Sequence, residues 1–391
     1  MSFFVMNWRN VNKIEYYFTL ALIAFVLSFV FLPSSKAVNN FYYVFLGLPA
    51  LWMFFCGRFH LERHTPLLWL WVAFMLWMLL AAIQVQTLQY LKHWLYVAVF
   101  CGLIVLLVDY RVLRQYRLCF AIFLIFLLYI LMTTAYYWYT GSHPVGRRVG
   151  DLPMRMSGPT YASIVLSAFF ALGAWVLLSR NNWFAFVLCS SLVVFCTAYV
   201  LQSRAGVLGA FLVIGAGCFY SLWFAENWRY RMLVLLTMVI GASGLFWMFG
   251  NQPVFQLLVA RADSGRFELW QAHYETFLEC RTWLGCAPDY FADIAIFGGR
   301  VIIEHPHNII FSVLLYHGWV GFLGFLTILA LTFFAAWQQR NAWGCFLLVS
   351  LLMLMFEGSR LVNQPSELWL LIFLPCMLIL AEQVRGGSEK V

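Results

Sequence analysis

The chain has 391 residues, of which 64% are hydrophobic and only 10% are charged, whereas soluble domains carry roughly 25% charged residues. This composition excludes a large soluble protein and indicates an integral membrane protein. The net charge of +8 does not indicate nucleic-acid binding, because the basic residues are scattered singly among short loops and form no patch.

Apolar runs recur from one end of the chain to the other. A helix that crosses a bilayer needs about 20 apolar residues, and it satisfies its own backbone hydrogen bonds. The sequence therefore predicts an all-α polytopic membrane protein, with a single transmembrane domain over 1–391 and about twelve transmembrane helices. The predicted spans are 14–32, 38–56, 67–86, 90–108, 118–140, 159–178, 183–200, 206–225, 232–250, 307–336, 342–361 and 366–382.

The loops between these spans differ in charge and in length. Short loops on one predicted side hold most of the arginines and lysines, which marks that side as cytoplasmic and places both termini there. The opposite side carries the longer loops 141–158 and 251–306, the second of which is the large extracytoplasmic loop. Four aromatic residues within it have helical spacing, which predicts a helix that packs on the bundle or the membrane, or else stacks on sugar rings: Phe267, Trp270, Tyr274 and Phe277.

Ten cysteines do not form a disulfide framework, because eight lie in or at the ends of spans, where cysteine behaves as a small hydrophobic residue. Cys280 and Cys286 are the exceptions, and both fall in the predicted extracytoplasmic loop. A disulfide between them is a hypothesis for an oxidising compartment.

Two arginines are noticeable against the apolar background. Arg204 lies between two spans, where an arginine is costly unless it is paired, functional or extended toward headgroups. Arg266 lies at the expected start of the loop helix, where the N–H groups already favour anions. Each arginine is either an anion clamp or a structural cation, and Glu268 or Asp263 could balance Arg266.

A third polar feature is the segment from Glu304 to Asn308. Pro306 suits the first turn of a helix, so we expect His307 in that turn, at the outer membrane surface. His307 is then a general base or a helix cap. A metal site with His305 is disfavoured, because no third ligand follows from the spacing and side chains two apart on a helix do not share a face.

These residues together resemble a known family. His307-Asn308, nine residues, then Gly318-Trp319-Val320-Gly321 resembles the periplasmic motif H-[NSQ]-x9-G-x-x-G of O-antigen ligases. Ser203–Gly206 and Gly265–Arg266, followed by Trp270, are similar to the two arginine motifs of that superfamily. Two weaker similarities are Arg155–Gly158 and Trp283–Phe291, the latter with Cys286 where the family usually has glycine.

The resemblance implies a GT-C-like glycosyltransferase of the bacterial inner membrane. It would move O-antigen polysaccharide from undecaprenyl diphosphate to a sugar hydroxyl of lipid A-core, at the periplasmic face. Arg204 and Arg266 are the expected catalytic cations and His307 the expected base; the expected substrate-binding residues are Arg155, His305, Asn308 and Trp270. The expected partners are the lipid-linked donor, the acceptor and membrane lipids, with no metal, cofactor or nucleic acid.

Three alternatives remain open. An O-antigen polymerase would join one lipid-linked repeat to another with the same motifs. A protein O-oligosaccharyltransferase is disfavoured, because such relatives usually have a longer chain. A transporter would keep its charged residues near the bilayer midplane, whereas these collect at one face.

Overall fold

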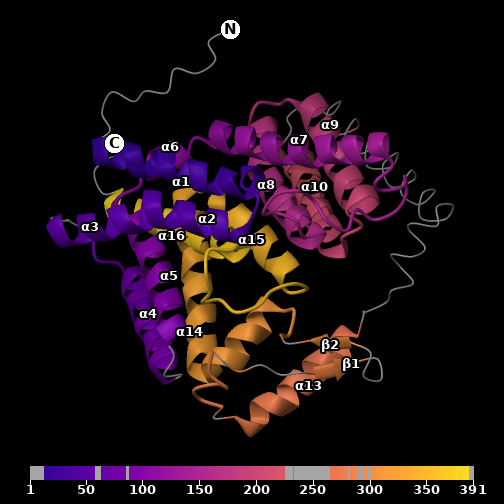
Figure 1. Ribbon diagram of the computed structural model, residues 1–391. Helices are drawn as coiled ribbons and strands as arrows, with labels where there is room; N and C mark the ends of the chain where they lie inside the picture. The colour runs from indigo at the N-terminus through magenta and orange to yellow at the C-terminus, as the bar shows by residue number, and fades with distance from the viewer. Residues whose placement is uncertain are drawn as a thin grey trace.

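The computed structural model describes residues 13–57, 63–84, 88–224, 232, 265–280, 282–288, 290, 294–296, 301–303 and 305–386. In this part of the chain, apolar helices form a bundle and two short strands form a hairpin (Figure 1). The helices of the first half are α1 (Lys13–Phe31), α2 (Ser35–Tyr42), η2 (Tyr43–Gly47), α3 (Leu48–Cys56), α4 (Pro66–Gln84), α5 (Leu88–Leu106), α6 (Tyr110–Leu113), α7 (Tyr116–Thr140), α8 (Pro159–Ser179), α9 (Trp183–Val194), η3 (Phe195–Val200) and α10 (Arg204–Phe224). They are followed by α13 (Arg266–Glu279), β1 (Ile294–Ile296), β2 (Val301–Ile303), α14 (Ile309–Gln339), α15 (Trp343–Leu354), η4 (Trp369–Phe373) and α16 (Leu374–Arg385).

The described residues confirm a multi-pass membrane protein. They contain nine helices that are long and apolar enough to cross a bilayer, each close to a predicted span. Apart from residue 232, the predicted span 232–250 lies outside the described residues. These nine are Lys13–Phe31, Ser35–Cys56, Pro66–Gln84, Leu88–Leu106, Tyr116–Thr140, Pro159–Ser179, Trp183–Val200, Arg204–Trp223 and Ile309–Gln339.

One predicted span is wrong at its end. The span 342–361 was expected to continue through Glu357 and Arg360, but α15 ends at Leu354. The chain then turns through Gly358, whose φ of 151° is a conformation that residues with a Cβ rarely adopt. Charged side chains at positions 357 and 360 would be costly on a lipid-facing helix, so the chain leaves the helix before them.

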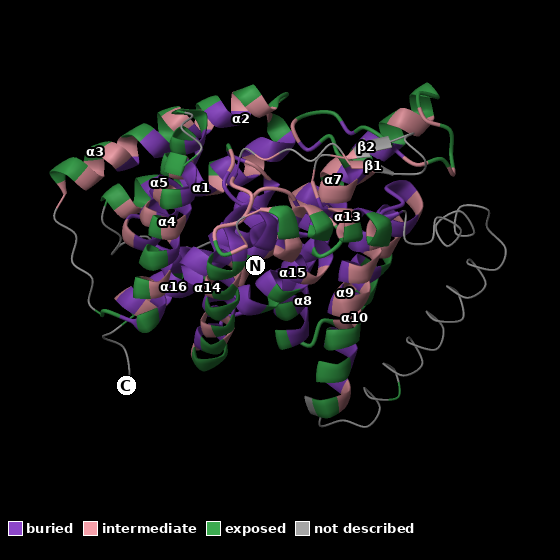
Figure 2. Ribbon diagram, turned by 90° about the horizontal axis from the view of Figure 1, so that it is seen from below, coloured by how far each residue is buried: buried purple, intermediate pink, exposed green. Residues whose placement is uncertain are grey.

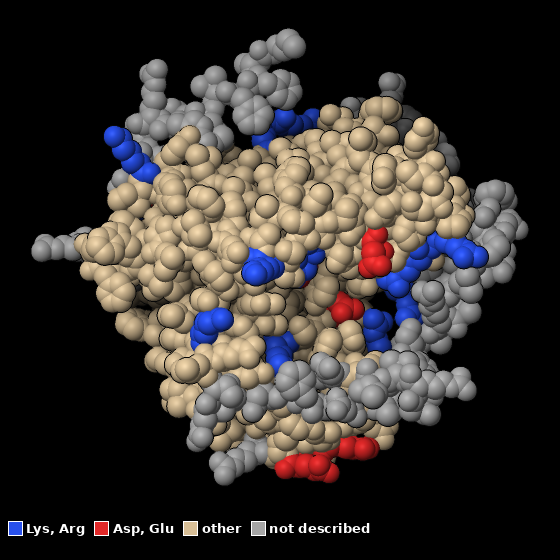
Figure 3. Space-filling model, viewed as in Figure 1, with Lys and Arg blue, Asp and Glu red and all other residues tan. Residues whose placement is uncertain are grey.

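Helix α8 forms the centre of one half of the bundle. It packs against α7, α10 and α15, and most of its residues are buried. Buried residues concentrate in the middle of the bundle and exposed residues lie along outer helices such as α3 (Figure 2). Most of the surface in Figure 3 is uncharged, and several of the charged side chains that it shows lie across the middle of this face.

The two ends of α14 lie in different polar surroundings. His307 precedes its first residue, whereas the guanidinium of Arg114 donates to the carbonyl of Gln339 at its last turn. At that second end, ion pairs join Arg114 to Glu382 and Arg385 to Glu15. Arg114 and Arg385, two of the basic residues predicted to share one side, therefore lie near the end of α14 away from His307.

The predicted helix in the long loop is confirmed as α13. Its Phe277 is fully buried against Leu315 and Tyr316 of α14, whereas Phe267 is 70% exposed. Packing against the bundle therefore explains part of the aromatic stripe. Strands β1 and β2 pair antiparallel, with Ile294 opposite Ile303, beside α13 (Figure 1).

Candidate active site

The histidine segment does not start α14 in the predicted way. Asn308 is the N-cap, and its Oδ1 accepts a hydrogen bond from the N–H of Phe311 at 3.1 Å. His307 therefore lies just before the cap, and its expected place in the first turn is wrong. The reason is local, since asparagine is among the best N-cap residues. Asn308, expected to bind substrate, is buried and makes this cap.

His307 has a left-handed backbone, with φ of 49°. Such a conformation is strained for a residue with a Cβ and persists only when the surroundings hold it. Trp270 of α13 supplies one such contact, because its indole N–H donates to the carbonyl of Pro306 at 2.9 Å. The structure thus places Trp270, also expected to bind substrate, as a support for the histidine segment.

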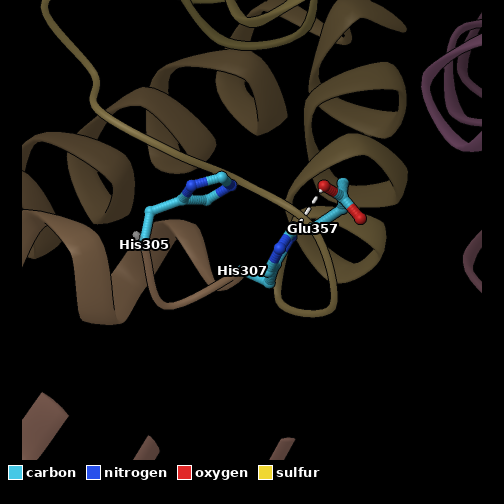
Figure 4. Close-up of side chains that lie close together, drawn as sticks. All are labelled: His305, His307 and Glu357. Atoms are coloured by element: carbon cyan, nitrogen blue, oxygen red, sulfur yellow. Dashed lines mark hydrogen bonds and ion pairs between the residues drawn. The ribbon is translucent and has the colours of Figure 1, made fainter. Parts of the chain in front are cut away.

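A carboxylate completes the surroundings of His307. Nδ1 of His307 lies 2.9 Å from Oε1 of Glu357, which comes from the loop after α15, 50 residues further along the chain (Figure 4). A carboxylate can only accept, so Nδ1 of His307 donates and a neutral ring keeps its lone pair on Nε2. This arrangement orients an imidazole to take a proton at Nε2.

His305 lies beside this pair, with its ring centroid 4.2 Å from that of His307. Burial lowers the pKa of His305 to about 4, with smaller contributions from His307 and Arg360, while Glu357 opposes them. His305 is therefore neutral near pH 7. One ligand atom from each of His305, His307 and Glu357 lies within 4.8 Å of the others, so these three residues could hold a metal ion.

The two predicted catalytic arginines lie at different helix ends. Arg266 opens α13, and its Nη2 donates to the carbonyl of Phe356 at 2.6 Å, next to Glu357 in the chain. Arg204 opens α10, directly after Ser203, whose Oγ lies 2.6 Å from Oγ of Ser163 in α8. The structure thus brings Arg266 to the histidine cluster and puts Arg204 at the contact of α10 with α8.

The first turn of α8 lies between the histidine cluster and the start of α10, which carries Arg204. Tyr161 in that turn lies within electrostatic range of Glu357, Glu367 and Arg155. The arginine motif needs a glycine at position 206, because any side chain there would clash with α8. A Cβ on Gly206 would lie only 2.4 Å from Cβ of Ser163. The glycine lets α10 approach α8 closely at the end that carries Arg204.

Arg155, expected to bind substrate, is held in an ion pair. Its Nη1 and Nη2 donate to the two carboxylate oxygens of Glu367 at 2.6 and 3.1 Å. Its backbone N–H donates to the carbonyl of Leu32 at 2.8 Å, and its guanidinium lies over the ring of Phe29. Arg155 therefore joins the segment before α8 to α1 and to the start of η4.

Sequence reasoning missed Glu357, Arg360 and Glu367. Arg360 donates to the hydroxyl of Tyr90 and to the carbonyl of Tyr290, both at 3.0 Å. All three are charged residues at the ends of two otherwise apolar predicted spans. Because charged residues in or beside a membrane segment often have a function, this position could have marked them as site candidates.

The loop after α13 packs against Gly318, the first glycine of the histidine motif. Gly318 interrupts α14 with φ of 66°, and a Cβ on it would stand 2.4 Å from the carbonyl of Trp283. Trp319 N–H donates to the carbonyl of Thr282 at 2.9 Å, and Cys286 N–H to that of Leu315 at 2.8 Å. The loop after α13 thus docks in the break of α14, which positions α13 relative to the histidines.

The hypothesis of a disulfide in this loop is confirmed. Cys280 and Cys286 are bonded, with their Cα atoms 5.1 Å apart. The cysteine that departs from the usual glycine of the family therefore has a role, because it closes the loop that docks on α14.

Comparison with known proteins agrees with the motifs. Residues 189–326 match the family model described as O-Antigen ligase. The resemblance to the O-antigen ligase family is confirmed. The matched segment includes Arg204, Arg266 and His307, whereas Glu357 lies beyond it. A Pseudomonas aeruginosa protein named O-antigen ligase is 28% identical over 158 residues, which are 39% of this chain and 38% of that relative. The aligned part of the chain therefore spans well under half of that O-antigen ligase's length.

Proposed function

We propose that this chain is an O-antigen ligase that transfers O-antigen polysaccharide from undecaprenyl diphosphate to a sugar hydroxyl of lipid A-core. The observation that carries this proposal is the pair formed by His307 and Glu357, which orients an imidazole beside Arg266. The family match of residues 189–326 supports a glycosyl transfer of this type.

In the proposed reaction, His307 acts as the general base. Its Nε2 accepts the proton of the acceptor hydroxyl while that oxygen bonds to the anomeric carbon of the donor. The bond from this carbon to the diphosphate oxygen breaks, and its electron pair leaves with the diphosphate. Glu357 stabilises the imidazolium that forms, and the proton then passes from His307 to water or to the diphosphate.

Arg204 and Arg266 are proposed to stabilise the charge that develops on the diphosphate. A guanidinium remains charged at every relevant pH and binds phosphate oxygens with two parallel donors. Arg266 would exchange its contact with the carbonyl of Phe356 for the leaving group. Arg266→Lys should therefore lower the transfer rate of purified protein by about 10- to 100-fold, because lysine lacks the two-donor geometry. A fully active Arg266→Lys protein would contradict the two-donor proposal.

The membrane orientation is part of the proposal. We propose a GT-C-like protein of the bacterial inner membrane with about twelve spans, cytoplasmic termini, a periplasmic loop over 251–306 and a periplasmic active site. The gathering of Arg114 and Arg385 at the end of α14 away from His307 supports this orientation. A reporter fused at residue 275 should be active only outside the cytoplasm. Reporter activity in the cytoplasm would place the histidine cluster on the cytoplasmic side and contradict the proposed periplasmic active site.

A deletion strain tests the function itself. The lipopolysaccharide of the strain is separated on a gel, with wild-type and His307→Ala genes returned at equal membrane levels. A ligase predicts a bare core and free lipid-linked polymer in the deletion strain and with His307→Ala. A core carrying a single repeat would instead identify the chain as an O-antigen polymerase.

A further inference from the structure

The cluster around His307 has the geometry of a metal site. One ligand atom from each of His305, His307 and Glu357 lies within 4.8 Å of the others, and two of these residues are already 2.9 Å apart (Figure 4). Ligand atoms lie about 2.0–2.2 Å from a zinc ion, which separates them by roughly 3.3 Å around a tetrahedral centre. Small rotations of the side chains would therefore bring all three onto one ion.

The chemistry of the ligands selects the class of ion. Two imidazole nitrogens and one carboxylate suit zinc, cobalt, nickel or copper, whereas magnesium and calcium prefer oxygen ligands. Three protein ligands leave a fourth position for water. Arg360 lies near His305 and opposes a cation there, so we expect weaker binding than in a structural zinc site.

A second observation points to the same place. His273 of α13 is completely buried, and its ring lies in hydrogen-bonding range of the backbone of His305. It lies within electrostatic range of both His305 and His307. A contact of this kind holds the segment that carries His305 and His307 in place, so the cluster is partly ordered before an ion binds.

We propose that His305, His307 and Glu357 bind a divalent transition metal ion of the zinc class, and that the bound ion stops glycosyl transfer. The inhibition rests on the proposed function, whereas the binding does not. If the ion binds Nε2 of His307, it occupies the lone pair that would accept the proton. If it binds Nδ1, the ring proton moves to Nε2, and the base is lost in that case as well.

Binding is measured first, without any substrate. The protein is purified in nanodiscs with a tag that contains no histidine and is titrated with Co²⁺, whose visible absorption reports the ligands, followed by competition with Zn²⁺. We expect one ion per chain. His305→Ala, His307→Ala and Glu357→Gln should each weaken binding at least tenfold. The matched control is His64→Ala, which removes an exposed histidine outside the cluster and should bind as the wild type does.

Transfer is then measured on the same preparations. Zn²⁺ should inhibit the wild type at the concentrations at which it displaces Co²⁺, and EDTA should restore the full rate. Binding that is unchanged in all three ligand variants overturns the site. Binding without inhibition, or a rate that needs the metal, overturns the inhibitory role. If the metal-free wild type transfers no glycan to lipid A-core, the proposed function fails while the binding result stands.

Discussion

Replacing Glu357 with glutamine tests the proposed mechanism most directly, because this substitution keeps the shape of the side chain and removes its charge. The His307 and Glu357 side chains are 29% and 14% exposed, so the pair lies between protein interior and water. Two unit charges about 4 Å apart interact by about 4 kcal/mol at an effective dielectric constant near 20, and by about 1 kcal/mol in water. An intermediate value of about 2 kcal/mol for the imidazolium that forms during transfer corresponds to roughly a 30-fold slower reaction.

The amide can slow the reaction further. Its NH₂ group can face Nδ1 of His307 and stabilise the tautomer that carries the proton on Nε2, which cannot act as a base. Glu357→Gln should therefore lower kcat by at least about 30-fold while the KM for the lipid-linked donor changes little.

The assay is the initial rate of glycan transfer to lipid A-core by purified protein in nanodiscs, with donor binding measured separately. Glu279→Gln is the matched control, because it removes an exposed carboxylate of α13 away from the histidines. If Glu357→Gln keeps more than half of the wild-type rate while His307→Ala is inactive, the carboxylate does not assist the base, and this reasoning is refuted.

Three further predictions concern the same region. His307→Gln should retain donor binding and lose about 100- to 10,000-fold in rate, because glutamine can hydrogen-bond but cannot accept the proton; near-normal turnover would leave His307 only a positioning role. Burial lowers the pKa of His273 to about 4, so the unfolded chain binds a proton that the folded chain does not between about pH 6.5 and 4. The Tm of the wild type should therefore fall as the pH is lowered through this range and level off below it, and His273→Gln should fall less in a thermal-shift series; equal falls would contradict the assignment. The Cys280–Cys286 bridge should appear in a non-reduced digest by mass spectrometry, and the paired serine substitutions should lower stability by roughly 2 kcal/mol, as expected for a loop of this length. Two alkylated thiols in the untreated protein would end that prediction.

The membrane class, most of the helical spans and the loop helix follow from the sequence alone. Hydropathy and helical spacing are properties of a continuous segment, and a membrane helix satisfies its own hydrogen bonds, so neighbouring residues suffice to predict it. The Cys280–Cys286 bridge was only a hypothesis from two loop cysteines six positions apart, and the fold decides it by bringing their Cα atoms to 5.1 Å. His307, Arg204 and Arg266 were recognisable because each is a polar residue in a motif of fixed local spacing.

The tertiary structure alone decides what these residues contact. Glu357 reaches His307 from 50 residues away, through a turn at Gly358 that the apolar pattern of the last spans concealed. The metal site was disfavoured for want of a third ligand, and the fold supplies one in Glu357. Likewise Arg155 meets Glu367 across 212 positions. Pairings of this kind depend on how helices pack side by side, and no periodicity within one segment specifies which loop ends at which helix.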